Sequence, residues 1–449
     1  MAGVAEKFVN SVREFSVTPS NIAALSNFIT KSYDVLIKCP LAHLDNALET
    51  LLPDQHAVGI LTILLVKYHQ LMAGSPAERR CVSMEEAELN KLITQTDIFV
   101  ETCNIEHVRY VLDIFNEMVH HCAELLIERQ TGARAIPIVT RAITRIREGE
   151  SQLTALHSDL CHLCLCTKTF KPALPFLDVD ITDIQRKGNL GRFDSKHFLL
   201  YYYYGGMIYA ALKNFKRAAF FFEIAVSTPC SAVSAIMVES YKKYVLVHLL
   251  AKRIKPAPLK FAPAMFTRQI KNTGMIYDEL ASAYASSIQS NLQAVVDKHK
   301  DRYEQDGNYG LVKQCIRSLY KKNIQKLTRT FLTLSFNDVA NRVHLASSSE
   351  AERYLLEMIE DEEIYATMNQ KDGMVEFHDY PEKYNNPAML AFLQQQERQC
   401  MLLNSKLSEC EQIITVTPDY VGKVASYSRD DDGPKPGPSN LFLGQTQDD

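Results

Sequence analysis

The sequence predicts an all-α helical-repeat solenoid, followed by a winged-helix subdomain and a single C-terminal helix. Gly and Pro are sparse, with 17 of each in 449 residues, so turns are few and the elements should be long and mostly helical. A pattern of small and large apolar residues recurs three times between residues 123 and 225. Beyond about residue 320 the periodicity changes to short helices followed by a segment with strand alternation.

The repeated unit has a small residue, a larger one at +3, Ala at +12, an apolar residue at +16 and a fifth position at +19. The three copies are Ala123, Leu126, Ala135, Val139 and Ala142; Cys161, Cys164, Ala173, Leu177 and Asp180; and Gly206, Tyr209, Ala218, Phe222 and Ala225. This spacing resembles the tetratricopeptide (TPR) helix-turn-helix unit. Small residues let the two helices of a unit approach closely, and each unit is stabilised by stacking on the next. Because Asp180 departs from the pattern, we expect TPR-like, degenerate units.

Two segments should interrupt the repeats. Gly74–Arg80 is polar and predicts a loop. Residues 255–263 hold three Pro, which is too many for a helix interior. Pro229 should end the second helix of the third unit, and helical periodicity should resume at Met275.

Three short helices should open the next region. Residues 323–334 have apolar residues at helical spacing and predict the first helix. Ser335 with Asp338, and Ser349 with Glu352, predict the N-termini of the second and third, the latter as a capping box.

A β-hairpin should follow the third helix. Residues 364–368 alternate between the two faces of a strand, and residues 375–377 alternate back. Asp372 and Gly373 between them supply a tight turn. Three helices and a hairpin are the outline of a winged helix, and we expect no other β structure.

The last predicted helix follows Asn386 and Pro387. Its apolar residues fall at heptad spacing with Gln396 as the single polar member: Met389, Leu393, Cys400, Leu403, Leu407, Cys410 and Ile414. A stripe this narrow suits packing between helices. Beyond Pro418 the chain is rich in Asp, Gly and Pro, which predicts a disordered acidic tail.

Composition excludes several classes of protein. The net charge of −4 argues against a dedicated nucleic-acid or anionic-membrane binder, since either concentrates positive charge. The 11 Cys are scattered, which favours a reducing compartment and buried free thiols. The longest apolar run, residues 57–66, is about half the length that spans a bilayer. We therefore expect a soluble, intracellular protein without a secretory signal.

One cluster of residues resembles a metal site. His157, Cys161 and Cys164 share a helical face, and His162 and Cys166 lie beside them. However, zinc needs a fourth ligand, and the cluster occupies the small-residue helix of a repeat, where Cys is a natural filler. Packing is the favoured interpretation, and we predict no metal or cofactor.

The winged helix raises the alternative of a nucleic-acid adaptor. Residues 307–337 contain six basic residues and no acid. Yet the third helix, the one expected to enter the major groove, has seven acids and one Arg between Ser349 and Glu363. Phosphates would repel such a helix, so nucleic acid is disfavoured as a partner. Motifs for phosphate binding, nucleophilic catalysis and His-x-His zinc isopeptidases are also missing from the sequence, and nothing in it supports an enzyme.

Helical repeats that run into a winged helix, with a heptad-like helix behind it, resemble the PCI family. That family supplies scaffold subunits to the proteasome lid, the COP9 signalosome and an initiation-factor complex. Five strings resemble signalosome members of the family in particular: residues 201–209 (YYYYGGMIY), 239–244 (ESYKKY), 318–325 (SLYKKNIQ), 369–375 (NQKDGMV) and 381–389 (PEKYNNPAM). The similarity runs from Phe8 to about Pro418.

The resemblance implies a non-catalytic scaffold subunit, located in cytoplasm and nucleus. Its complex would remove a ubiquitin-like modifier from cullins and so regulate cullin-RING ubiquitin ligases. No catalytic, cofactor or metal residue is carried over, because the isopeptidase zinc site of that complex belongs to another subunit. A scaffold of the proteasome lid or of an initiation-factor complex would share the same architecture, and so remains an alternative.

The resemblance also implies how the chain meets its partners. Family winged helices pair edge to edge, and the C-terminal helices of all subunits gather into one bundle. Here the hairpin edge would comprise Ile364, Ala366, Met368, Asp372, Gly373, Val375 and Phe377, and the heptad stripe named above would enter the bundle. The expected boundaries are 1–196 for N-terminal repeats, 197–380 for the PCI domain (repeats 197–310, winged helix about 320–380), 385–418 for the assembly helix and 419–449 for the tail.

Overall fold

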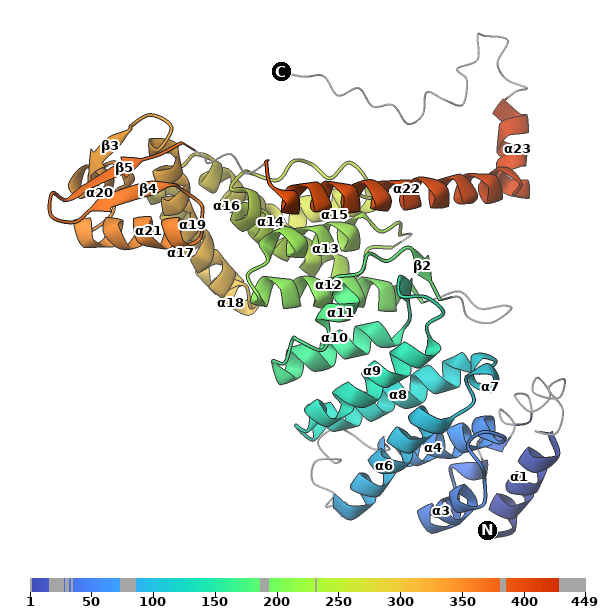
Figure 1. The fold of residues 1–449 in the computed structure, drawn as a ribbon. Helices are drawn as coiled ribbons and strands as arrows, with labels where there is room; N and C mark the ends of the chain where they lie inside the picture. The colour runs from blue at the N-terminus through green and yellow to red at the C-terminus, as the bar shows by residue number, and fades with distance from the viewer. Residues whose placement is uncertain are drawn as a thin grey trace. The chain divides into compact units, whose positions relative to one another are not determined.

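The computed structural model describes residues 2–15, 28, 32–33, 35–72, 86–185, 194–230, 232–379 and 385–427. The chain forms two compact units. Unit 1 comprises Met1–Thr330 and Phe336–Leu355, and unit 2 comprises Phe331–Ser335 and Leu356–Asp449 (Figure 1). The predicted loop at Gly74–Arg80 lies outside the described residues.

Unit 1 is built almost entirely of α-helices. Up to the third repeat these are α1 (Ala2–Phe15), α3 (Leu41–Glu49), α4 (Ala57–Met72), α6 (Glu86–Thr102), α7 (Ile105–Arg109), α8 (Leu112–Glu128), α9 (Ala135–Ile146), α10 (Leu156–Thr167), α11 (Leu174–Leu177), α12 (Ser195–Ala211) and α13 (Phe215–Ser227). Beyond it come α14 (Ala235–Lys252), α15 (Ala264–Thr273), α16 (Met275–Ala285), α17 (Gln289–Lys298), α18 (Lys300–Gln305), α19 (Tyr309–Leu327), α20 (Phe336–Val343) and α21 (Ser348–Glu360). The last of these ends in unit 2.

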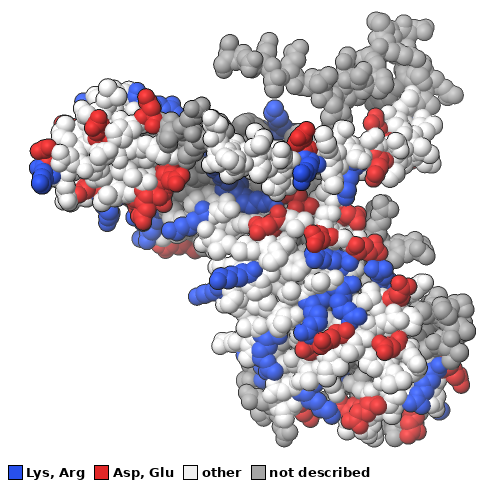
Figure 2. Space-filling model, viewed as in Figure 1, with Lys and Arg blue, Asp and Glu red and all other residues white. Residues whose placement is uncertain are grey.

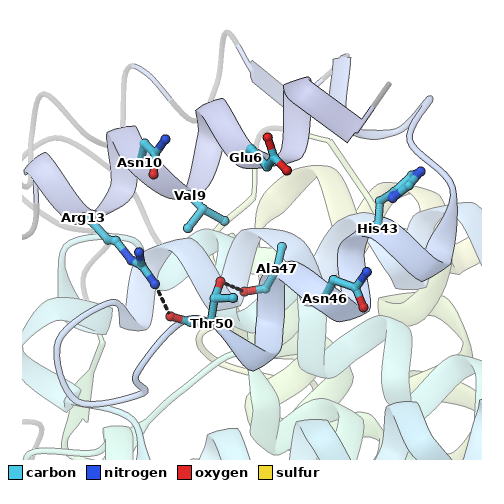
Figure 3. A pocket seen from close by; sticks show the side chains of 8 residues that line it. All are labelled: Glu6, Val9, Asn10, Arg13, His43, Asn46, Ala47 and Thr50. Carbon is cyan, nitrogen blue, oxygen red and sulfur yellow. Dashed lines mark hydrogen bonds between the residues drawn. The ribbon is translucent and has the colours of Figure 1, made fainter.

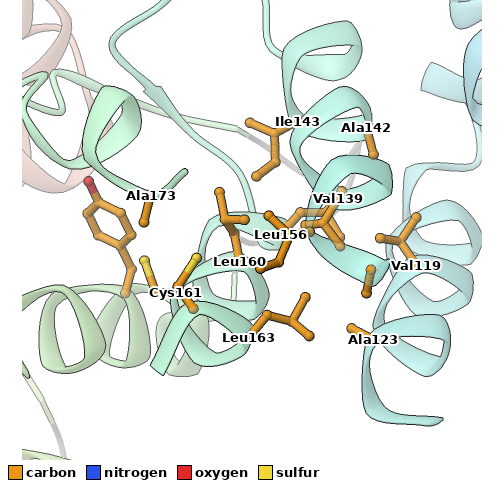
Figure 4. Packing of buried hydrophobic residues seen from close by; sticks show 14 of the residues in the cluster. Val119, Ala123, Val139, Ala142, Ile143, Leu156, Leu160, Cys161, Leu163 and Ala173 are labelled. Carbon is orange, nitrogen blue, oxygen red and sulfur yellow. The ribbon is translucent and has the colours of Figure 1, made fainter. Parts of the chain in front are cut away.

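The three predicted repeats correspond to the helix pairs α8–α9, α10–α11 and α12–α13. Of the fifteen pattern residues, only Asp180, the one that departs from the pattern, is exposed. Figure 4 shows Ala123, Val139 and Cys161 packed among the side chains of the neighbouring helices. The helices α8, α10 and α12 contact one another in turn, so that each unit covers the apolar face of the one before it. The predicted TPR-like solenoid is therefore confirmed.

The closest helix approach in the repeats depends on two glycines. A Cβ at Gly205 would lie 2.7 Å from the Phe221 ring, and one at Gly206 would lie 2.8 Å from the Phe222 ring. Real side chains do not tolerate such distances, so only Gly lets α12 and α13 pack this closely. This pair of glycines in the middle of α12 therefore serves helix packing.

Arginines tie successive helices together at their ends. Arg145 on α9 donates hydrogen bonds to the carbonyl oxygens of Val100, Glu101 and Cys103, where α6 ends. Arg217 on α13 donates to the Leu177 carbonyl at the end of α11. The last carbonyls of a helix have no partner within it, so a guanidinium from the next helix both satisfies them and fixes the stacking.

The interruptions of the repeats fall close to their predicted places. Helix α13 ends at Ser227, two residues before Pro229. Residues 255–263 are not helical. Helicity resumes at Ala264, earlier than the predicted Met275, because Pro263 directly precedes the first turn of α15, where a proline is compatible with helix initiation.

Two β elements were not predicted from the sequence. A short parallel pair joins β1 (Gln152–Leu153) to β2 (Asp183–Ile184) in unit 1. In unit 2, β3 (Thr333–Ser335) pairs with the predicted hairpin. The predicted helix over residues 323–334 is therefore wrong at its end: α19 begins at Tyr309 and stops at Leu327. Strands of two or three residues are too short to show a periodicity of their own.

The third helix of the winged helix starts slightly earlier than predicted. The Oγ of Ser347 accepts a hydrogen bond from the Glu350 backbone N–H, and the Glu350 carboxylate accepts one from the Ala346 N–H. The capping box is thus Ser347 with Glu350, and not Ser349 with Glu352. The same Ser-x-x-Glu pattern occurs twice in one serine-rich segment, and the first copy is the one used.

Unit 2 contains a three-stranded antiparallel sheet and two helices. The sheet consists of β3, β4 (Ala366–Asn369) and β5 (Met374–Phe377), with the order β3-β5-β4. The helices are α22 (Pro387–Thr415) and α23 (Pro418–Tyr427). Helix α23 corrects the predicted start of the disordered tail at 419, because Pro418 opens a short amphipathic helix there; residues 428–449 lie outside the described residues.

Candidate interaction surfaces

The predicted hairpin residues divide into a buried set and an edge set. Ile364, Val375 and Phe377 are buried, at 5%, 0% and 5% exposure. Ala366 and Met368 on β4 are half-buried and lie opposite Phe377 and Val375. Strand β5 is central, so β4 is one edge of the sheet. Three of the seven predicted residues are therefore buried in the core, and the exposed edge of the hairpin is formed by β4.

The pairing shows which groups of β4 point outward. The His378 N–H donates to the Tyr365 carbonyl, and the next paired residues along the hairpin are Ala366 and Phe377, then Thr367 and Glu376. Antiparallel pairs alternate between hydrogen-bonded and non-hydrogen-bonded, so Tyr365 and Thr367 face β5. Accordingly, the Phe377 N–H points away from β4 and donates to the Leu332 carbonyl, just before β3, at 2.7 Å. The backbone N–H and C=O groups of Ala366 and Met368 therefore point away from the sheet.

The hairpin turn is fixed by its own side chains. The Asn369 Oδ1 accepts hydrogen bonds from the backbone N–H groups of Lys371 and Asp372. The Asn369 Nδ2 donates to the Asp372 carboxylate at 2.6 Å. Gly373 has φ +65°, a conformation that favours Gly. Asp372 and Gly373, predicted as interaction residues, thus set the register that presents the β4 edge.

Helix α22 has no buried residue along its 29 positions. The Asn386 Oδ1 caps it by accepting a hydrogen bond from the Ala388 N–H, and the helix starts at Pro387. Six of the seven stripe residues are exposed, and Met389 is half-buried. Leu403 and Leu407, at the middle of the stripe, are 50% and 68% exposed. Large exposed apolar surfaces of this kind are typical of interaction sites.

Sequence reasoning missed part of this surface. Five large apolar residues of α22 outside the stripe are also more than half exposed: Leu390, Phe392, Met401, Leu402 and Ile413. A heptad template follows one face only, so it passed over them. At 100° per residue they extend the apolar surface well beyond the stripe, and a helix that is apolar on several sides is typical of a bundle interior.

Two family models match this chain, as do curated relatives. Residues 19–265 match the family model described as COP9 signalosome complex subunit 3, N-terminal helical repeats, and residues 296–379 match the PCI domain. The COP9 signalosome complex subunit 3 of Drosophila melanogaster is 41% identical over 445 residues, which cover 96% of this chain and 97% of the relative. The subunit 3 of Dictyostelium discoideum is 33% identical over 385 residues, 85% of this chain and 88% of the relative.

The chain belongs to the COP9 signalosome subunit 3 family. The resemblance to signalosome members of the PCI family is thereby confirmed, together with the helical-repeat and winged-helix fold class. Members of this family are non-catalytic PCI subunits, in agreement with the missing catalytic motifs. Among the described residues, the helices are too short or too polar to cross a membrane.

Of the residues suspected of binding metal, His157, Cys161 and Cys164 are buried in the repeat region, whereas Cys166 is exposed. His157 is buried, its ring packs edge-on against Phe176 and Tyr201, and burial lowers its pKa to about 4. Burial also raises the pKa of Cys164 to about 11, so that thiol stays protonated and is a poor ligand. His162 instead stacks on Tyr204. The structure therefore favours the packing interpretation of the cluster.

The acid-free stretch at 307–337 is partly engaged within unit 1. Lys313 lies 4.5 Å above the Tyr309 ring, and Lys322 lies 4.7 Å above the Tyr284 ring. Lys326 donates to the Ser287 hydroxyl at 2.7 Å. On the face of unit 1 in Figure 2, basic and acidic side chains are interspersed. These contacts weaken the nucleic-acid alternative, because cations that track phosphates must be presented together to solvent.

A surface pocket lies between α1 and α3 (Figure 3). It is lined by Glu6, Val9, Asn10, Arg13, His43, Asn46, Ala47 and Thr50. Arg13 donates a hydrogen bond to the Thr50 carbonyl at 2.7 Å, just beyond the end of α3. Arg13 therefore joins α1 to the end of α3, just as Arg145 joins α9 to the end of α6. The pocket is best explained as a by-product of this packing between helices.

Proposed function

We propose that the chain is a non-catalytic scaffold subunit of the COP9 signalosome and contacts its neighbours through two surfaces of unit 2. The first is the β4 edge, which offers the outward N–H and C=O groups of Ala366 and Met368 to a neighbouring strand. The second is α22, which offers its apolar faces to helices of other subunits. The observation that carries the proposal is that α22 has no buried residue.

The complex as a whole would act on cullins. As a member of a non-catalytic family, the chain supports removal of a ubiquitin-like modifier from cullins by holding other subunits together, and so regulates cullin-RING ubiquitin ligases. We place it in cytoplasm and nucleus, which fractionation of cells can test. The repeats of unit 1 are stabilised by their own stacking, so the proposal assigns assembly to unit 2.

The α22 surface is tested with charge substitutions in the full-length chain. Leu403→Glu and Leu407→Glu place carboxylates on the stripe, where desolvation in a helical bundle would be costly. Ser405→Glu adds the same charge on the opposite side of the helix and is the matched control. We expect co-purification with other signalosome subunits to be lost for the stripe variants and retained for the control. Normal co-purification of both stripe variants would refute the role of α22.

The β4 edge is tested by removing one outward donor. Ala366→Pro eliminates an N–H that faces away from β5, a place where an edge strand accepts proline. Thr367→Pro removes an N–H that faces β5 and should break the hairpin itself. We expect Ala366→Pro to fold normally and to lose a neighbouring subunit, with association through α22 retained. If Ala366→Pro assembles with every subunit, the edge is not an interface.

A further inference from the structure

Two histidines and a glutamate converge between α4 and α8 in unit 1. His69 lies in the last turn of α4, and Glu117 and His121 lie one turn apart on α8. One ligand atom from each lies within 4.8 Å of the others. The His121 Nε2 and the Glu117 Oε1 are 3.7 Å apart. The His69 and His121 rings meet edge to face, with centroids 5.7 Å apart.

Ring packing does not account for His121. Both of its ring nitrogens are buried, and neither has a hydrogen-bond partner within the part of the chain that the structure describes. The two nearest carboxylates, those of Glu117 and Glu124, lie 3.7 and 3.9 Å from the ring, beyond hydrogen-bond length. Buried polar atoms are almost always satisfied, so this unsatisfied pair calls for a partner outside the chain, such as a water or an ion. A cation at this position would give the Nε2 its partner.

The surroundings supply an outer shell for both histidines. The Tyr33 hydroxyl lies 3.2 Å from the His69 Nδ1, so it can serve as the acceptor for that nitrogen when the Nε2 binds an ion. The Glu124 carboxylate lies on the Nδ1 side of His121. A metal-binding histidine commonly donates its other N–H to a carboxylate or another acceptor, which fixes its tautomer and orientation.

We propose that His69, Glu117 and His121 bind a divalent transition metal ion of the zinc class and thereby join α4 to α8. Imidazole and carboxylate suit zinc, and two histidines with one glutamate form a known three-ligand set for it. His69 and Glu117 are exposed, so the ion can enter from solvent. Ligand atoms of a tetrahedral zinc site lie ~3.3 Å apart, so binding requires the exposed side chains of His69 and Glu117 to move closer than the 4.8 Å within which the ligand atoms now lie.

Cobalt substitution tests the site on the tag-free, full-length chain. After chelator treatment, Co²⁺ should bind at one equivalent and give the visible d–d bands of a tetrahedral or five-coordinate ion, and Zn²⁺ should displace it. His69→Gln, Glu117→Gln and His121→Gln should abolish the bands. Tyr33→Phe removes only the outer-shell oxygen and should weaken binding by about 10–100-fold.

His120→Gln is the matched control. It lies next to His121 on α8 but hydrogen-bonds to Asp159 at 3.0 Å, so it should leave cobalt binding unchanged. Thermal melting checks folding: all variants should melt like wild type in chelator, and Zn²⁺ should raise the melting temperature of wild type and His120→Gln only. Missing d–d bands in wild type, or unchanged bands in the His69 and His121 variants, would overturn the proposal. A thiolate charge-transfer band would place the ion on cysteines and overturn it as well.

Discussion

Helices α10 and α22 are both rich in large apolar residues, yet they differ completely in burial. In α10, Leu156, Leu160 and Leu163 are all inaccessible to water. In α22 no residue is buried. The difference lies in the packing partners, because α10 packs extensively against α8, α9 and α12, whereas the main contact of α22 within the described part of unit 2 is a small one with α23. The repeats contain their own complementary faces, whereas no residue of α22 is buried by the described chain.

The largest contrast is expected from leucine truncation. Leu160→Ala removes a fully buried side chain and should lower the free energy of unfolding by about 2–5 kcal/mol. Leu403→Ala removes one that is half exposed and should change it by less than about 0.5 kcal/mol. Urea unfolding followed by circular dichroism measures both. Comparable losses for the two variants would mean that α22 is covered within its own chain.

Glycine substitutions should have opposite signs in the two regions. Gly206→Ala places a methyl group 2.8 Å from the Phe222 ring and should cost about 1–3 kcal/mol by overpacking. Gly422→Ala on α23 meets nothing within 4 Å, and should stabilise that helix by about 0.5–1 kcal/mol through its lower backbone entropy cost. Thermal melting reports the first change and amide exchange of residues 418–427 the second. A neutral Gly206→Ala would show that α12 and α13 can separate freely.

Helix caps sharpen the comparison further. Asn214 accepts a hydrogen bond from the Arg217 N–H at the start of α13, and Asn386 accepts one from the Ala388 N–H at the start of α22. Asn214→Ala should lower the stability of unit 1 by about 0.5–2 kcal/mol. Asn386→Ala should only increase amide exchange in the first turn of α22. Global destabilisation by Asn386→Ala would contradict the independence of α22.

The smallest expected effect concerns acid stability. Burial raises the pKa of Asp45, but the hydrogen bonds from Lys67 and Lys91 lower it by more than burial raises it. The pKa of this carboxyl therefore lies below its ordinary value of 3.8. A lowered folded-state pKa stabilises the fold above the unfolded pKa, and this contribution is lost as the pH falls through the folded value. Acidification below about pH 4 should therefore weaken the packing of α3 against α4.

Lys91→Gln removes one of these hydrogen bonds, at 3.0 Å, and should move the acid transition to slightly higher pH. Arg398→Gln on α22 is the control and should not move it. Urea unfolding between pH 2 and 6 measures the transition. An identical transition in Lys91→Gln and wild type would show that this hydrogen bond to Asp45 does not contribute to acid stability.

Much of the fold could be predicted from the sequence because its main signals are periodic. Small residues at fixed intervals, such as Ala123 and Ala135, report close helix packing, and that constraint acts on side-chain volume alone. The hairpin was equally predictable, since Asp372 and Gly373 fix the turn by local geometry. The heptad stripe of α22 could be predicted as well, although the exposed apolar residues on the other faces of the helix could not be identified from the heptad spacing.

The features that could not be predicted from the sequence depend on contacts between segments that are far apart in the chain. Strand β3 forms because residues 333–335 pair with β5 some forty positions later, and three residues carry no signal of their own. Val375 and Phe377 are buried because they share one face of β5, whereas Met374 and Glu376 on the other face are exposed; the central place of β5 in the sheet is seen only from its pairing with β3. Likewise, His69 lies 48 positions before Glu117 in the sequence, and only the packing of α4 on α8 brings their side chains together.

The exposure of α22 also bears on the abundance of the chain in a cell. A copy without partners presents some nine large apolar side chains to water along a single helix. Chaperones and proteases act on exposed apolar surface of this kind, and unassembled copies should be removed faster than assembled ones. Under the role in assembly proposed for α22, the chain would then accumulate only in proportion to the subunits that cover it, and the same helix would keep the stoichiometry of the complex.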